Sequence, residues 1–121
     1  MQYESSMTVE SKARPGVSFV IARMSFGRRV ELMRQIREMI QKHEFLAAGE
    51  SPQEKLDAAL LTAEIERSYV AWGLQEIRGL ELDGAPATPE GLTLSGPEDL
   101  FREVLASVRA ECGLSEAERK N

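Results

Sequence analysis

The sequence predicts a mainly α-helical protein with a minor β element, in which three amphipathic helices pack around one core beside one or two short strands. Apolar residues recur at helical spacing over three long stretches of the chain. Capping residues, proline or glycine bound each stretch. A short segment near residue 20 is rich in β-branched and aromatic residues, as a strand would be.

The length and composition favour one folded domain. The chain has 121 residues, 42% hydrophobic and 29% charged, which is ordinary for a globular protein and argues against wholesale disorder. Residues 1–16 are polar, lack a clear pattern and end in Arg14-Pro15-Gly16. We therefore predict a flexible N-terminal arm over 1–16 and a single helical domain over 17–121.

The first two elements of this domain are predicted to be a strand and a long helix. Residues 17–22 are apolar and β-branched or aromatic at both parities, which indicates a strand. A helix is expected from about Ser25 to Ala48, with Gly49 as its stop. Its apolar residues form a wide stripe, typical of a helix with more than one neighbour. They are Val30, Leu32, Met33, Ile36, Met39, Ile40, Leu46 and Ala47.

The second helix has the clearest local signal in the chain. Ser51, Pro52 and Glu54 match a capping box with proline at the first helical position. Gly73 is the expected end of this helix. Its apolar residues are Leu56, Leu60, Leu61, Ile65, Tyr69 and Trp72.

The last third of the chain reads as short elements followed by a helix. We expect a short strand around 79–82 and a turn at Asp83-Gly84. Thr88-Pro89-Glu90 predicts a short helix, and Gly96-Pro97 opens a long one that ends at Gly113. Ser115 and Glu118 would cap one further turn. The expected shared core comprises Val30, Met33, Ile36, Ile40, Leu60, Ile65, Tyr69, Phe101, Val104, Leu105 and Val108.

Residues that could carry catalysis are scarce. The chain has one His and one Cys, too few for a zinc site, and it contains no glycine-rich phosphate loop. His43 and Cys112 could form a dyad, but both continue apolar helical stripes. We expect a half-buried histidine and a packed cysteine. The sequence thus predicts no catalytic, cofactor-binding or metal-binding residue, and a protein that is not an enzyme.

Charge and cysteine content bound the partners and the compartment. The net charge is −5 and the pI is about 5.0, which makes nucleic acid an unlikely partner. Residues 1–43 nevertheless hold 8 Lys and Arg against 4 Glu. The lone cysteine and the absence of a long apolar run favour the cytoplasm and no membrane association.

Two groups of residues are candidates for binding a protein partner. Arg28, Arg29, Arg34 and Arg37 make the first long helix basic, although Glu31 and Glu38 are expected to dilute this face. The second group is aromatic or apolar and lies at the ends of elements, where interface anchors are favoured. It consists of Tyr69, Trp72, Leu80 and Leu82.

Four segments of the second half of the chain form a recognisable pattern: Tyr69–Gly73, Ile77–Leu80, Asp83–Glu90 and Gly96–Leu100. Through these segments, the chain from Tyr69 onward resembles the tail assembly chaperones of long-tailed bacteriophages and prophages. It implies a small acidic protein of the host bacterial cytoplasm that is absent from the finished virion. It also implies binding to the helical tape measure protein, and to other tail components, while the tail tube polymerises.

Several alternatives remain open at this point. A small helical DNA-associated regulator would use the basic first helix, and an enzyme would need a pocket with perturbed carboxylates. A homo-oligomer is compatible with either. The family often makes a longer product by a −1 ribosomal slip, and Arg119-Lys120-Asn121 can be encoded by a slippery run. An ordinary polar C-terminus explains this ending more simply.

Overall fold

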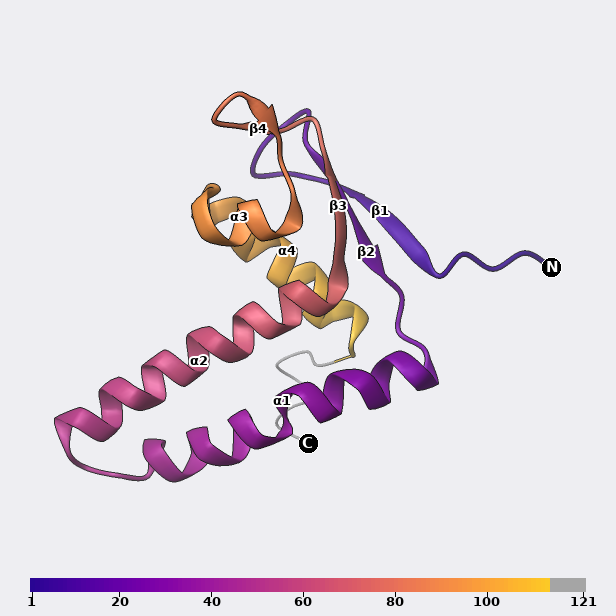
Figure 1. The fold of residues 1–121 in the computed structure, drawn as a ribbon. Helices are drawn as coiled ribbons and strands as arrows, with labels where there is room; N and C mark the ends of the chain where they lie inside the picture. The colour runs from indigo at the N-terminus through magenta and orange to yellow at the C-terminus, as the bar shows by residue number, and fades with distance from the viewer. Residues whose placement is uncertain (114–121) are drawn as a thin grey trace.

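A long helical hairpin and a small three-stranded sheet make up most of the structure, a computed structural model that describes residues 1–113 (Figure 1). The mainly helical α+β prediction is confirmed. The predicted cap at Ser115 and the chain end at Asn121 lie outside the described residues. The described elements are β1 (Ser6–Glu10), β2 (Ser18–Ala22), α1 (Phe26–Ala47), α2 (Pro52–Gly73), β3 (Leu74–Arg78), β4 (Glu81–Leu82), β5 (Ala85–Pro86), α3 (Pro89–Ser95) and α4 (Glu98–Glu111).

Local capping sets the ends of the hairpin helices. The Ser25 side chain accepts a hydrogen bond from the Arg28 amide and so caps α1. The predicted capping box of α2 is confirmed, because Ser51 accepts from the Glu54 amide while the Glu54 carboxylate accepts from the Ser51 amide. α1 and α2 run antiparallel, and their loop end projects away from the sheet and from α4 (Figure 1).

The sheet has the order β1-β2-β3, and both neighbours pair antiparallel to β2. Residues 19–22 of β2 are buried, as a central strand requires. The prediction of a flexible arm is wrong for residues 6–16, because residues 6–10 form β1 at the sheet edge. Met7 and Val9 are half-buried and alternate with polar residues, so β1 gains its stability from pairing with β2.

A carboxylate on α4 holds the loop between β1 and β2. Glu103 accepts hydrogen bonds from the Ser11 hydroxyl, from the Lys12 amide at 2.7 Å and from the Ala13 amide at 3.4 Å. The Ser11 side chain is buried, and its hydroxyl also accepts from the Arg14 amide. Residues that the sequence suggested were loose are thus bonded to a helix about ninety positions away in the chain.

The segment after α2 differs in register from the prediction. A strand begins immediately after Gly73, as β3, and buries Leu74 and Ile77, whereas the predicted strand at 79–82 is reduced to the two residues of β4. The Asp83-Gly84 turn is confirmed, since it joins β4 to β5 with φ of 52° and 83°, the left-handed pair that such a turn requires. The helix starts at 89 and 98 are confirmed as well.

The core lies where the sheet, α2 and α4 meet, together with the near end of α1. The predicted members Ile36, Tyr69, Val104, Leu105 and Val108 are buried there, and Ile65 and Phe101 pack against them. The core prediction is wrong for a second set of residues. Val30 is only half-buried, and Met33, Ile40 and Leu60 are exposed.

Gly73, at the end of α2, packs directly against Val108 of α4. A Cβ atom placed there would lie 2.7 Å from both methyl carbons of Val108. We expect Gly73→Ala to lower the free energy of unfolding by about 1–3 kcal/mol, because neither helix can yield without disturbing the core. Urea denaturation provides the measurement. Gly27→Ala is the matched control, since nothing lies within 4 Å of its Cβ position. Equal stability of the two variants would contradict this packing.

Glu103 makes the stability depend on pH. Burial alone would raise the pKa of Glu103, but hydrogen bonds from Ser11, Lys12 and Ala13 outweigh it and lower the pKa below its usual value. A depressed folded-state pKa adds stability above the unfolded pKa, and this is lost as pH falls through the folded pKa. Glu103→Gln should therefore lower the free energy of unfolding by about 1–2 kcal/mol at about pH 7. The loss should become progressively smaller below about pH 4. If Glu103→Gln lowers the free energy of unfolding by the same amount at both pH values, the charge of Glu103 does not contribute to stability.

Candidate functional site

Helix α1 carries two apolar seams, and α2 covers only one of them. The covered seam consists of Leu32, Ile36, Met39, His43 and Leu46, which follow one another at spacings of four and three residues. Leu32 and Ile36 are buried, and Met39 packs against the core. His43 is half-buried, as predicted, and its Nε2 lies 2.9 Å from the Thr62 hydroxyl of α2.

The second seam repeats the same spacing on a neighbouring face of α1. We call it the outer seam, and it consists of Phe26, Val30, Met33, Arg37 and Ile40. Phe26 is 86% exposed, Met33 59% and Ile40 37%. Spacings of four and three residues are the pattern by which one helix packs along another. The outer seam is thus shaped for a helix, and within residues 1–113 no helix covers it.

More apolar surface is exposed toward the loop end of the hairpin. Phe45 near the end of α1, and Leu56 and Leu60 on α2, are all exposed. Together with the outer seam, they leave several large apolar side chains of the projecting hairpin exposed. Contiguous exposed apolar residues on a soluble domain commonly mark a protein-binding surface.

The two aromatic candidates for partner binding belong to the core instead. Tyr69 is 2% exposed and Trp72 6% exposed, so the prediction that they anchor a partner is wrong. The Arg109 guanidinium lies 5.3 Å from the centre of the Tyr69 ring. The Arg28 guanidinium lies 4.8 Å from that of Trp72 and donates a 3.0 Å hydrogen bond to the Trp72 carbonyl. Both rings lie at the end of α2 that meets α4 and the sheet.

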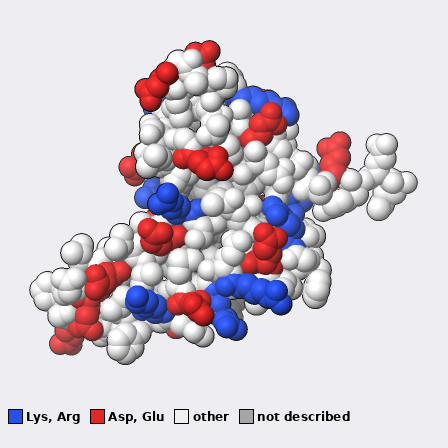
Figure 2. Space-filling view, viewed as in Figure 1, with Lys and Arg blue, Asp and Glu red and all other residues white. Residues whose placement is uncertain are grey.

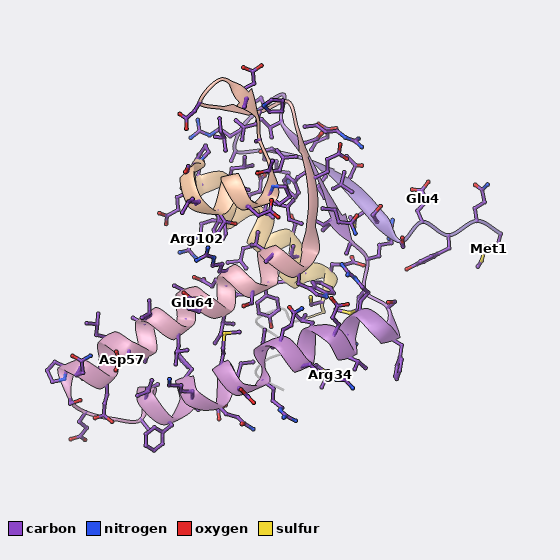
Figure 3. All side chains as sticks on the ribbon, viewed as in Figure 1. Met1, Glu4, Arg34, Asp57, Glu64 and Arg102 are labelled. Carbon is purple, nitrogen blue, oxygen red and sulfur yellow. The ribbon has the colours of Figure 1, made fainter. Side chains whose placement is uncertain are left out.

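The remaining candidates do not form one site. Arg28 is held by Trp72, whereas Arg29, Arg34 and Arg37 are exposed. Leu80 packs partly on the core, and Leu82 lies toward Gly91 of α3, in the β4–β5 region away from α1. Figure 3 shows Arg34 pointing away from α2, and basic side chains gather over α1 at the bottom of Figure 2.

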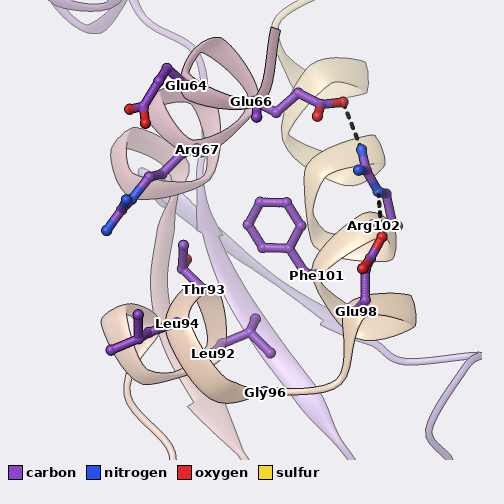
Figure 4. Close-up of a pocket in the computed structure, with 11 residues that line it drawn as sticks. Glu64, Glu66, Arg67, Leu92, Thr93, Leu94, Gly96, Glu98, Phe101 and Arg102 are labelled. Carbon is purple, nitrogen blue, oxygen red and sulfur yellow. Dashed lines mark hydrogen bonds and ion pairs between the residues drawn. The ribbon is translucent and has the colours of Figure 1, made fainter. Parts of the chain in front are cut away.

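A cleft of about 400 Å³ lies between α2, α3 and α4 (Figure 4). Leu92 and Phe101 form its apolar wall. At its rim, Arg102 pairs with Glu66 at 2.7 Å and with Glu98 at 3.7 Å. The Thr93 hydroxyl donates to the Pro89 carbonyl. No cysteine, histidine or serine is among the described residues that line the cleft.

Cys112 is packed in the core, as predicted. Burial raises the pKa of its thiol to about 11; Arg29 lowers it and Glu111 raises it to lesser extents. His43 bonds to Thr62 within the hairpin and shows no interaction with Cys112. Residues 1–113 contain no cluster of His, Cys, Asp and Glu fit to hold a metal ion. None of their helices has the length and apolar character needed to cross a membrane.

Comparison of the chain with protein-family models, with curated protein sequences and with solved structures finds no match. The surface of the hairpin and the resemblance carried by the second half of the sequence are therefore what bears on the function.

The state of Cys112 has a measurable consequence. A thiol with a pKa near 11 is almost entirely protonated at about pH 8, and burial blocks access to it. We expect a disulfide reagent such as DTNB to react with the folded protein roughly 10²-fold more slowly than with the same chain in concentrated urea. Absorbance of the released thiolate follows both rates. Equal rates would place Cys112 at the surface and reopen the question of a reactive cysteine.

Proposed function

We propose that this protein is a non-catalytic assembly chaperone or adaptor that binds a helical partner through the α1–α2 hairpin. The observation that supports this best is the outer seam of α1, a helix-packing surface that residues 1–113 leave uncovered. An adaptor has to keep such a surface accessible, whereas a protein without partners gains stability by covering it.

The resemblance to tail assembly chaperones suggests the identity of the partner. On that basis, we propose the tape measure protein of a long-tailed phage or prophage, bound in the host cytoplasm during tail assembly. A tape measure protein is long and helical, and it exposes apolar residues until the tail tube surrounds it. The seam spacing on α1 suits such a helix.

A DNA-associated regulator built on the basic first helix is less well supported. That function requires Arg28, Arg29, Arg34 and Arg37 to line one exposed stripe. Arg28 instead stacks on Trp72, bonds to its carbonyl and lies 3.7 Å from Glu31, so the four arginines do not form one free stripe.

Co-expression tests the proposed function. We expect a tape measure protein encoded beside this chain to become mostly soluble when the two are produced together, and to elute with it from a sizing column. An unrelated coiled-coil protein of similar length is the control, and its solubility should not change. No soluble complex with the tape measure protein, or an equal effect on the control, would count against the proposal.

A further inference from the structure

The outer seam has the length and spacing of a binding site for one helix. Its residues, from Phe26 to Ile40, extend over roughly 22 Å at 1.5 Å per residue. The next two positions at the same spacing are Glu44 and Ala47, at the loop end of α1. The apolar part of the seam therefore lies in the first two thirds of α1, where a partner helix would make its closest contacts.

Two arginines give this surface a charge. Arg37 occupies a seam position, and Arg34 follows Met33 and so lies directly beside the seam. Both are exposed, and neither forms an ion pair with any residue in 1–113.

The acids of α1, among them Glu44 in the seam itself, leave Arg34 and Arg37 without an ion pair. Glu31 lies 3.7 Å from Arg28, in agreement with the prediction that it dilutes the basic face. Glu31 and Glu38 also stand three and four residues from Arg34, and so neighbour it on the helix surface. Thus the middle of the outer seam combines exposed apolar side chains with cations that have no partner.

We propose that the outer seam binds an acidic amphipathic helix of a partner protein. Its apolar residues would pack between Phe26 and Ile40, and its flanking carboxylates would pair with Arg34 and Arg37. This inference rests on the proposed function and adds the binding face and the charge of the partner helix. Pairing of opposite charges beside an apolar seam is how helices select their partners.

A second copy of the chain fits this surface less well. Two identical seams packed together would bring Arg34 and Arg37 of each copy close to the same cations of the other, and like charges across an interface are repulsive. Nucleic acid also fits poorly, because Met33 and Ile40 would face phosphates instead of apolar groups.

Two synthetic peptides provide the direct probe. Both have about three heptads with leucine at the seam positions, and one has glutamate while the other has lysine at the flanking positions. We expect the glutamate peptide to bind roughly ten-fold more tightly by fluorescence anisotropy at about 50 mM NaCl, and the ratio to shrink at about 300 mM. Equal affinities, or no binding of either peptide, would overturn the inference.

Variants of exposed residues locate the binding face. The double variant Met33→Glu, Ile40→Glu should weaken binding of the glutamate peptide at least ten-fold, and Arg34→Glu, Arg37→Glu should reverse the preference between the peptides. The matched control is Ala85→Glu, Leu94→Glu, which places the same two charges at exposed positions of β5 and α3, outside the hairpin, and should leave binding unchanged. Circular dichroism melts show that each variant is folded.

The outcomes separate this inference from the proposed function. If the control variant no longer binds the tape measure protein while the α1 variants still bind it, the outer seam is not the binding surface. The proposed adaptor function is then still supported. If the glutamate peptide binds but the tape measure protein does not, the proposed partner is contradicted. The outer seam is then still supported as the binding surface. Sedimentation could also show that the protein is a dimer and that Met33→Glu, Ile40→Glu dissociates it. That result would identify a second copy of the chain as the occupant of the outer seam and overturn the inference.

Discussion

α1 packs against α2 through one seam, and this single contact determines what the rest of the hairpin exposes. Leu32 and Ile36 are buried under α2, so the parallel row through Met33 and Ile40 has to face outward. A helix of this length with only one neighbour cannot hide two apolar rows. The exposed row is therefore a consequence of the fold.

The rest of the molecule fixes the base from which the hairpin projects. Gly73 lets Val108 of α4 reach the end of α2, while Arg28 of α1 covers Trp72. Glu111 of α4 accepts a hydrogen bond from the Met24 amide just before α1, and Glu103 holds the loop between β1 and β2. These contacts between distant parts of the chain hold the first turns of α1 against a rigid core. Such a base reduces the conformational entropy that this protein itself would lose on binding a partner.

The sequence was informative where structure depends on neighbouring residues. The capping box at Ser51 and the turn at Asp83-Gly84 are local, and both are confirmed. It was misleading where the outcome depends on distant contacts. Two rows on α1 have the same spacing, so periodicity alone could not show which one α2 would cover. In β1, only Met7 and Val9 are apolar, so the sequence signal for a strand is weak. β1 forms because it pairs with the edge of β2.

The same limit applied to the candidate site. From the sequence, Tyr69 and Trp72 could be either partner-binding residues or core residues. They are core residues because the end of α2 is packed against α4.

Backbone amide NMR tests most directly whether the outer seam of α1 is the binding surface. On titration with an acidic amphipathic helix, amide signals of residues 26–40 should shift together, while those around Leu56 and Leu60 stay in place. Shifts confined to α2 or to the cleft beside α3, with α1 unchanged, would contradict it.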